Sequence, residues 1–377
     1  MGVAYTSIQW NRQKKFYDCV LVGGVAAFLV AFGALTKILF PFITDEILII
    51  RTFGVAAFFL LHIILCLGPL CRLQPKFLPL LYNRRHAGVT CFLLALIHAV
   101  LVVATYHAGS DTNPLLSIFV SSPLTGSVAG VPFQPFGFFA LVILLLMAAT
   151  SHDFWLANLT APVWKALHML VYAAYALLVL HVTFGALSGE ASPVYVGAMA
   201  AGLAIVLGLH LAAARKEIPV DREIKKNDAG DFIDACAVAD IPENRARIVC
   251  LSGERVAIFK YDGKISVISN VCQHQNGPLG EGKIVSGCIT CPWHGYQYVP
   301  ATGASPPPFV EKVPTFNVRV RNGRVFVHPK PNPAGTKAEP ALVAAGNQPG
   351  GTGVENSSAG ENVDATPGGT PAATKNE

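Results

Sequence analysis

Four side chains in the last third of the chain are typical metal ligands. Cys272 and His274 form a Cys-x-His pair, and Cys291 and His294 form a Cys-x-x-His pair after sixteen intervening residues. Two thiolates and two imidazoles can hold a [2Fe–2S] cluster, in which the thiolates bind one iron and the imidazoles bind the other. The same residue types also suit a tetrahedral zinc ion. Short alternating apolar runs flank both pairs, and this β context favours the iron–sulfur cluster.

Histidines within apolar stretches form a second group. His98, His168 and His181 lie in long apolar segments, where an ionisable side chain is costly and usually functional. Neutral imidazoles on two facing helices are what a six-coordinate b haem requires. We expect His98 and His181 in the outer half of a membrane and His168 near its cytoplasmic end. The fourth ligand stays open between His86, near that same end, and His62.

The elements that carry these histidines are predicted to be membrane helices. Hydrophobic residues make up 52% of the chain and charged residues only 14%. Basic residues are dispersed among the apolar runs, so no nucleic-acid partner is predicted. Apolar segments near the ~20 residues that cross a bilayer predict a six-helix transmembrane bundle over 17–214. The six segments are 17–40, 47–69, 88–106, 136–151, 163–185 and 194–214.

Lys and Arg concentrate in alternate connections of this bundle. Basic residues lie in the N-terminal segment 1–16, in 70–87, at Lys165 and in 215–226, whereas 107–135 has none. Basic loops face the cytoplasm. Both termini are therefore predicted to be cytoplasmic in a multi-pass protein of the cell (inner) membrane.

From about Glu217 the pattern changes to short alternating runs. Asp262-Gly263 and Asn322-Gly323 each separate two such runs, which is a strong hairpin signal. A small all-β domain is therefore predicted over 217–329. Residues 330–377 are rich in Pro, Gly, Ala, Asn and Thr with almost no aromatic residues, which predicts a disordered C-terminal tail.

The two ligand pairs in their β context resemble the Rieske ferredoxin family, over about 217–329. The resemblance implies that the four Cys and His residues named above hold one [2Fe–2S] cluster. It also implies that the cysteine side of the cluster is buried and that the His274 and His294 edges are exposed as the electron port. The large domain with mononuclear iron that Rieske oxygenases add is absent, so the cluster is expected to carry electrons only.

Three residues depart from the high-potential members of that family. Gly277 and Trp293 stand where those members have two further cysteines that form a disulfide. Tyr296 stands where they have a serine whose hydroxyl bonds a cluster sulfur. Fewer hydrogen bonds to sulfur lower the reduction potential. The potential is therefore expected near the low end of the Rieske range, about −150 mV.

Residues 47–185 resemble the ferric reductase-like transmembrane family, which binds haem b. The matching pattern is the Arg84–Gly88 segment leading to His98, followed by a helix with His168 and His181 thirteen residues apart. The resemblance implies one or two b haems with these histidines as ligands. Thirteen residues rotate a side chain by about 140° on a straight helix. His168 and His181 therefore share a face only if the helix is interrupted between them.

Together these features predict a membrane-bound electron-transfer protein, a component of an oxidoreductase with no assigned catalytic residue. Electrons would pass between the cytoplasmic cluster and haem in the bundle, with a cytoplasmic reductase as donor, because no Gly-x-Gly-x-x-Gly nucleotide-binding segment follows a strand here. Two alternatives remain open. Haem could instead take electrons from a membrane quinol for a cytoplasmic oxygenase, or the bundle could bind no haem and only tether a ferredoxin to the lipid bilayer.

Overall fold

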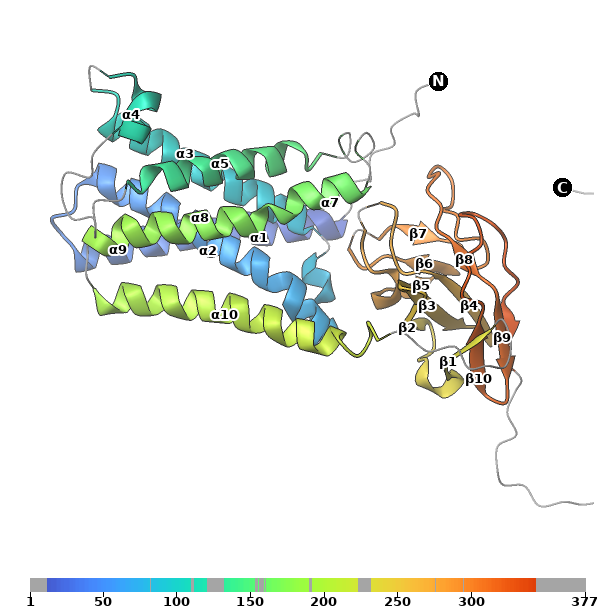
Figure 1. The fold of residues 1–377 in the computed structure, drawn as a ribbon. Coiled ribbons are helices and arrows are strands. Elements are labelled where there is room, and N and C mark those ends of the chain that lie inside the picture. The colour runs from blue at the N-terminus through green and yellow to red at the C-terminus, as the bar shows by residue number, and fades with distance from the viewer. Residues whose placement is uncertain are drawn as a thin grey trace, which may run out of the picture. The chain divides into compact units, whose positions relative to one another are not determined.

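The computed structural model has a helical N-terminal region followed by a β domain (Figure 1). It describes residues 12–81, 83–109, 112–120, 132–152, 155, 159, 161–189, 192–222, 232–274, 276–293 and 295–343. The long helices are α1 (Arg12–Leu39), α2 (Asp45–Leu73), α3 (Arg84–Tyr106), α5 (Gln134–Ala149), α8 (Val171–Phe184) and α10 (Pro193–Glu217). The shorter ones are η1 (Pro75–Leu81), α4 (Pro114–Val120), α7 (Ala161–Met169) and α9 (Ala186–Gly189).

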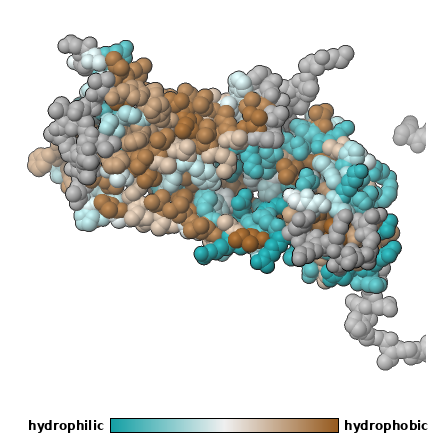
Figure 2. Space-filling model, viewed as in Figure 1, coloured by the Kyte–Doolittle hydropathy of each residue, from teal (hydrophilic) through white to brown (hydrophobic). Residues whose placement is uncertain are grey.

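Each of the six predicted apolar segments is mostly helical, with one break at Leu170 in the fifth and non-helical residues at a few segment ends. Five helical segments within 12–222 are long and apolar enough to cross a membrane, and α7 together with α8 forms one of them. The sixth, α5, has 16 residues, which corresponds to about 24 Å of helix against a hydrocarbon core of about 30 Å. Figure 2 shows that hydrophobic side chains cover the visible face of the helical region. A helical membrane region is thus supported, but the length criterion gives five spans rather than six.

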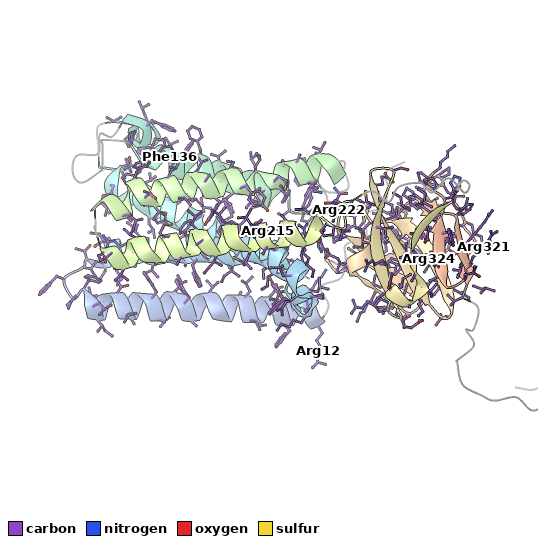
Figure 3. All side chains as sticks on the ribbon, turned by 60° about the horizontal axis from the view of Figure 1, so that its bottom comes forward. Arg12, Phe136, Arg215, Arg222, Arg321 and Arg324 are labelled. Atoms are coloured by element: carbon purple, nitrogen blue, oxygen red, sulfur yellow. The ribbon has the colours of Figure 1, made fainter. Side chains whose placement is uncertain are left out.

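Basic residues gather at one end of the helices. The Lys216 ammonium near the end of α10 donates to the Arg72 and Leu73 carbonyls near the end of α2, at 2.7 and 3.1 Å. Figure 3 shows Arg12 and Phe136 toward opposite ends of the bundle. This clustering is what the loop pattern requires, while the side of the membrane that the end faces stays a prediction.

The helix that carries His168 and His181 is interrupted between them. α7 ends at Met169, α8 begins at Val171, and the Leu170 N–H donates to the Leu167 carbonyl three residues earlier. This tighter turn breaks the regular rotation of a straight helix. An interruption that could reorient the two histidines is therefore present.

The β domain contains three small antiparallel sheets. β2 (Arg245–Leu251), β3 (Glu254–Tyr261), β4 (Lys264–Ser269), β8 (Thr315–Phe316) and β11 (Ala341–Leu342) form the largest. β1 (Ile233–Ala237), β9 (Val318–Arg321) and β10 (Arg324–Val327) form the second, and β5 (Lys283–Val285), β6 (Cys288–Thr290) and β7 (Gln297–Tyr298) the third. Asp262 and Asn322 occupy the two predicted hairpin turns with positive φ, each followed by a glycine.

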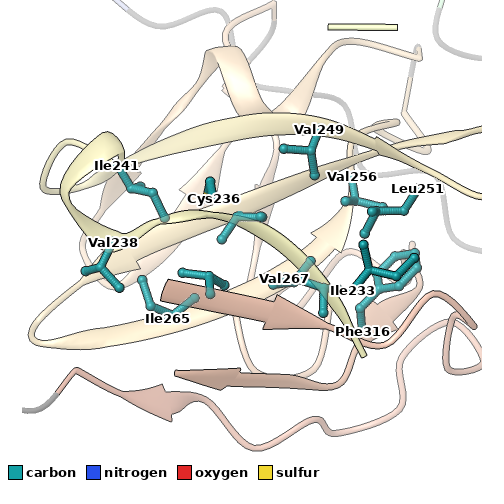
Figure 4. Packing of buried hydrophobic residues seen from close by; sticks show 13 residues of the cluster. Ile233, Cys236, Val238, Ile241, Val249, Leu251, Val256, Ile265, Val267 and Phe316 are labelled. Carbon is teal, nitrogen blue, oxygen red and sulfur yellow. The ribbon is translucent and has the colours of Figure 1, made fainter. Parts of the chain in front are cut away.

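Two apolar cores hold this domain. One lies between the first two sheets (Figure 4) and is built from alternate residues of their strands, including Ile233, Val267 and Phe316. The second lies below the metal-ligand pairs and includes Phe259 and Leu279. Alternation places every second side chain inward, which is why the sequence pattern predicted this domain.

The domain continues beyond its predicted end at residue 329. The Asn332 and Ala338 amides bond the carbonyls of Thr315 and Ala301, and Ala341 in β11 pairs with Ile265 of β4. Residues 330–343 therefore belong to the folded domain, which corrects the prediction that the disordered tail begins at 330. Composition misled here because backbone hydrogen bonds, together with a few small apolar side chains such as Ala338 and Ala341, bind this segment. The remainder of the predicted tail, 344–377, lies outside the described residues.

Candidate functional site

The first ligand pair lies on a loop that folds back on Cys272. The Cys272 N–H donates to the Gly277 carbonyl at 2.9 Å, and the Asn276 N–H donates to the Cys272 carbonyl at 2.7 Å. Asn276 has a φ of 56°, a conformation that Asn tolerates better than most residues. The loop joins β4 to a short 3₁₀ helix, Leu279–Glu281.

The second pair lies on a loop of the same shape between β6 and β7. The Cys291 N–H donates to the Tyr296 carbonyl at 2.8 Å, and the Gly295 N–H donates to the Cys291 carbonyl at 3.0 Å. Gly295 has a φ of 72°, where glycine is favoured. Each loop thus turns around its cysteine with hydrogen bonds to the fourth and fifth residues that follow it. Two such loops suit a centre that takes one Cys and one His from each.

The cysteine side of the site is buried, as predicted. Cys272 and Cys291 are 1% and 2% exposed. The Tyr298 hydroxyl lies 3.4 Å from Cys272 Sγ and accepts the Gln273 N–H at 3.0 Å. Burial, followed by the neighbouring Cys272, raises the pKa of Tyr298, so this hydroxyl stays protonated. Tyr298 is therefore a hydrogen-bond donor to one ligand sulfur, a role that the sequence analysis did not assign.

The histidine side is less open than predicted. His274 is 8% exposed, and its ring stacks on that of Tyr296 with centroids 4.9 Å apart and planes 9° from parallel. Phe309 packs against Tyr296 as well, with the two ring centroids 4.8 Å apart. The Tyr296 hydroxyl donates to Glu311. The tyrosine that replaces a serine here therefore covers a ligand, and the expected exposed edge at His274 is wrong. His294 lies outside the described residues.

No group of three Cys, His, Asp or Glu side chains converges on a single metal ion among the residues that the structure describes.

Gly277 and Trp293 lie side by side between the two loops. A Cβ atom on Gly277 would come within 2.8 Å of Cys291 Sγ and 3.1 Å of Trp293 Cδ2. These two positions were predicted to correspond to the disulfide of the high-potential members, and their adjacency agrees with that correspondence. Gly277 leaves room for Cys291 and for the indole, so a larger residue there would displace both.

Trp293 also contacts the helical region. It packs against Leu67, Cys71 and Leu81, and the Arg84 guanidinium lies 4.5 Å from the centroid of its ring. Trp293 stands between the ligands Cys291 and His294 in the chain. The loop that carries them is therefore in direct contact with the ends of α2 and α3. One sequence signal could have indicated this contact, namely a large aromatic residue within a candidate metal-ligand loop.

A second contact joins the β domain to the end of α10. Arg255 on β3 bonds Glu217 at 2.5 Å and Asp221 at 2.6 Å. The hydrogen bond from Arg255 lowers the pKa of Asp221. The Arg255 carbonyl in turn accepts the Asn270 N–H, just before the first ligand loop. Both ligand loops are thus linked to the helical region by named contacts.

Within the bundle, His98 of α3 and His181 of α8 face each other. Their ring centroids are 6.4 Å apart and their planes are 82° from parallel. His98 Nδ1 bonds the Ile50 carbonyl at 2.9 Å, and His181 Nδ1 bonds the Phe133 carbonyl at 3.0 Å. Since a carbonyl accepts only from N–H, each ring has its proton on Nδ1 and a lone pair on Nε2. Of the candidate histidines, these two are the pair that the fold brings together.

His168 is held in a different way. Its Nδ1 donates to the Trp164 carbonyl at 3.0 Å, and its ring stacks on Trp164 with centroids 3.8 Å apart. Its Nε2 is buried without a well-aligned hydrogen-bond partner among the described residues. Such an atom is costly unless it binds something. His168 is therefore a candidate ligand, but no contact joins it to another of the predicted histidines.

His86 and His62 have protein partners instead. His86 Nδ1 bonds Asp18 at 2.8 Å and lies 3.0 Å from the Asn83 amide. His62 bonds the Phe58 carbonyl through Nδ1 and the Tyr175 hydroxyl through Nε2. With both nitrogens bonded, His62 is a packing residue. His86 lines a cavity of 460 Å³ together with Asp18, Leu21, Val22, Arg85, Val89, Thr90, Ala148, Ser151 and His152.

Comparison with protein families assigns each region separately. The family model for the Rieske [2Fe-2S] domain matches residues 231–317. The model for the ferric reductase-like transmembrane component matches residues 53–179. Both resemblances seen in the sequence are therefore confirmed.

Individual relatives cover the β domain. The ferredoxin component of a naphthalene 1,2-dioxygenase/salicylate 5-hydroxylase system from Ralstonia sp is 30% identical over 98 residues, 26% of this chain and 94% of that ferredoxin. A cholesterol 7-desaturase from Xenopus laevis is 35% identical over 96 residues, 23% of this chain, and the match spans 21% of the desaturase.

Among solved structures, the ferredoxin of carbazole 1,9a-dioxygenase from Nocardioides aromaticivorans IC177 is 24% identical over 27% of this chain and 100% of its own, with a TM-score of 0.26. The Ralstonia ferredoxin is 30% identical and is covered over 94% of its length, so it identifies the β domain as a Rieske domain. The two ligand loops and the buried cysteines agree with this. The chain belongs to the Rieske [2Fe–2S] family and carries a ferric reductase-like transmembrane component in the same polypeptide.

Proposed function

We propose that this protein transfers electrons between a cytoplasmic Rieske cluster and b-type haem within its membrane helices. The observation that carries the proposal is the facing pair His98 and His181, 6.4 Å apart, in a chain that also has a Rieske domain. A cytoplasmic reductase is the proposed donor. When bound, the cluster and the haem each accept and release one electron at a time.

The residues around the cluster site fit that group. Cys272 and Cys291 would bind one iron, and His274 and His294 would bind the other. The buried cysteines and the Tyr298 hydroxyl near Cys272 Sγ suit a thiolate ligand that accepts a hydrogen bond.

The residues around the haem site also fit. Two imidazoles could hold one iron only if their rings lie close together and each has a free nitrogen directed at the space between them. The observed separation of His98 and His181 is 6.4 Å, and both Nδ1 atoms are already bonded to carbonyls. Their Nε2 lone pairs are therefore the atoms that would hold the iron. His168, whose Nε2 is buried with no well-aligned hydrogen bond among the described residues but close to the Met147 carbonyl, is the proposed ligand of a second haem.

Trp293 and Arg84 would hold the Cys291–His294 loop against the helices. A cation–π contact is worth about 0.5–2 kcal/mol, and the apolar residues around the indole add to it. Arg255 with Glu217 and Asp221 would restrain the other side of the domain. These contacts keep the two redox sites within one assembly and leave no need for diffusion between separate proteins.

Visible and electron paramagnetic spectra of the purified chain test this proposal. The wild type should contain a Rieske-type signal and a low-spin bis-imidazole haem. His98→Ala and His181→Ala should each remove the low-spin bis-imidazole signal and keep the cluster signal. His62→Ala is the matched control, because both nitrogens of His62 bond protein groups, and it should retain both signals.

A photochemical one-electron reductant added from the soluble side then tests the transfer itself. Wild-type haem should become reduced after the cluster, and Cys291→Ser should keep its haem but lose this route. Equal haem reduction rates in the wild type and in Cys291→Ser would remove the Rieske domain from the path. Absence of haem from the wild type would leave only the tethered ferredoxin.

A second candidate function has the opposite direction, from membrane quinol through haem and cluster to a cytoplasmic oxygenase. It is favoured by the relative that is the ferredoxin component of a dioxygenase system. The cavity beside His86 and Asp18, which is lined by both polar and apolar side chains, suits a quinone head group. A soluble short-chain quinol that reduces the haem of the Cys291→Ser variant would support this direction.

A further inference from the structure

His98 lies against two residues of α2, Ile50 and Gly54, which we call its seat. Its Nδ1 donates to the Ile50 carbonyl, and one helical turn later Gly54 lies directly beneath the ring. A Cβ atom on Gly54 would come within 2.8 Å of His98 Nδ1 and 3.0 Å of its Cε1, distances that side chains do not sustain. The absence of a side chain at Gly54 is therefore what allows the imidazole to reach the carbonyl.

His181 lies against an equivalent seat at the start of α5, made of Phe133 and Gly137. Its Nδ1 donates to the Phe133 carbonyl, and Gly137 lies one turn later beneath the ring. A Cβ atom on Gly137 would come within 2.7 Å of His181 Nδ1 and 2.8 Å of its Cε1. In both seats, the imidazole Nδ1 bonds a backbone carbonyl, and Nδ1 and Cε1 lie closest to the glycine.

The spacing in the sequence is also the same. In each seat 48 residues separate the carbonyl from its histidine. Every member of the second seat lies 83 positions after its counterpart, and both glycines follow a phenylalanine. Other buried positions of the helices agree at this offset. The matched pairs are Ala57 with Ala140, Leu61 with Leu144, Cys91 with Ala174, and Phe92 with Tyr175.

We propose that α2–α3 and α5–α8 are two copies of one ligand-presenting unit and that Gly54 and Gly137 are its positioning residues. This inference rests on the proposed haem site. Parallel repeats related by an axis along the membrane normal are a known way to build a site between two halves of a helical membrane protein. Here each half presents one imidazole to the space between them.

The seat has two consequences for a bound haem. The Nδ1–H···O=C bond fixes the tautomer and makes the imidazole a stronger donor to iron, which favours the oxidised state. The seats also set the ring planes, which are 82° apart. Nearly perpendicular imidazole planes give low-spin ferric haem a strongly anisotropic paramagnetic signal, whereas parallel planes give a rhombic one.

The experiment compares Gly54→Ala, Gly137→Ala and the wild-type chain. Each methyl group should push its imidazole off the carbonyl, so that haem affinity falls about tenfold and the potential of the retained haem rises. The two variants should behave alike, because the seats are equivalent. Gly68→Ala is the matched control in α2, since nothing lies within 4 Å of the position its Cβ would take. The cluster signal of the same chain reports whether each variant is folded.

The outcomes separate the inference from the function on which it rests. A wild type without bis-imidazole haem would refute the proposed function itself. A wild type with haem, but with Gly54→Ala and Gly137→Ala indistinguishable from Gly68→Ala, would refute the seats alone. If both variants fail to fold, the wild-type signal decides: a strongly anisotropic spectrum supports the seats, and a rhombic spectrum overturns them.

Discussion

At the cluster loops, the Tyr298 hydroxyl lies 3.4 Å from the sulfur of Cys272, a proposed cluster ligand. It accepts the Gln273 N–H, so its own proton is available to Cys272 Sγ. Tyr296, at the position where high-potential members have a serine, bonds Glu311 instead. Tyr298 thus supplies one donor, while the donor lost with the serine is not replaced by Tyr296, so the potential is still expected near the low end of the Rieske range.

Tyr298→Phe should lower the cluster's reduction potential by about 40 mV. The hydrogen bond stabilises the reduced, more negative cluster by ~1 kcal/mol, and its loss removes that preference. Protein-film voltammetry of the wild type and the variant measures the shift. Tyr261→Phe is the control, because its hydroxyl bonds Ser266 at 2.8 Å. An unchanged potential in Tyr298→Phe would contradict the assignment.

His168→Ala should remove a second haem and leave the haem of His98 and His181 in place. The repeat offset of 83 residues pairs His168 with Arg85, so no histidine stands opposite it by symmetry. The haem-to-cluster ratio, measured by pyridine haemochrome and iron analysis, should therefore fall while the low-spin signal remains.

His210→Ala is the control for this change. Its ring bonds the Val206 carbonyl and the Tyr172 hydroxyl, so its removal should not alter haem content. An unchanged haem-to-cluster ratio in His168→Ala would show that His168 binds no haem.

At the scale of elements, the basic residues of several helices lie at the same end of the bundle, and one helix, α5, is shorter than the others that could span a membrane. α5 follows a segment without basic residues, and α10 ends in Arg215, Lys216 and Glu217 beside the end of α2. The charge pattern and the spatial clustering of the basic residues agree. The positive-inside rule therefore predicts that this basic end of the bundle faces the cytoplasm.

Reporter fusions test that orientation. A reporter that is active only outside the cytoplasm should be silent when it is fused after residue 343 and active when it is inserted within 112–130. The insertion lies in the loop region without Lys or Arg, which the rule assigns to the outer side. The opposite pattern would place the cluster outside the cell and exclude a cytoplasmic donor.

At the scale of the whole molecule, the contact between the cluster loop and the helices decides whether electrons stay within one chain. Trp293→Ala should slow haem reduction by the cluster about tenfold. Loss of ~1.4 kcal/mol of contact energy lowers the population of the docked arrangement by that factor. Stopped-flow spectroscopy after photochemical reduction measures the rate.

Phe232→Ala is the matched control for Trp293→Ala. Phe232 also makes a cation–π contact, with Arg319 at 4.1 Å, but entirely within the β domain. Its loss should leave the transfer rate unchanged. Equal rates in the wild type and in Trp293→Ala would mean that the contact has no role in transfer.

The ion pairs of Arg255 give a pH dependence whose sign follows from Asp221. Because the folded-state pKa of Asp221 is lowered by Arg255, its contribution to stability is present above the ordinary Asp pKa of about 3.9 and is lost as pH falls through the folded value. Arg255→Gln should cost at most about 1 kcal/mol at pH 7, since Asp221 is largely exposed. Thermal loss of the cluster signal, compared at pH 7 and below pH 4, should show this difference shrinking. A constant difference would contradict the pairing.

The candidate ligand residues, the alternating strands and the apolar helices follow from the sequence alone. Each of these depends on residue type and on spacings of a few residues, which local chemistry and periodicity dictate. The Cys-x-His and Cys-x-x-His pairs required two tight loops, and the hairpin turns at Asp262 and Asn322 required positive φ. These features needed no knowledge of which elements pack together.

Only the tertiary structure decided which distant residues meet. It paired His98 with His181, bonded His86 to Asp18, covered His274 with Tyr296 and brought Trp293 against Arg84. It also joined residues 341–342 to the main sheet as an edge strand. The physical reason is that these contacts depend on how helices rotate and strands pair across many tens of residues. Hydrophobic burial and backbone hydrogen bonding of the whole fold determine that arrangement, and no local pattern encodes it.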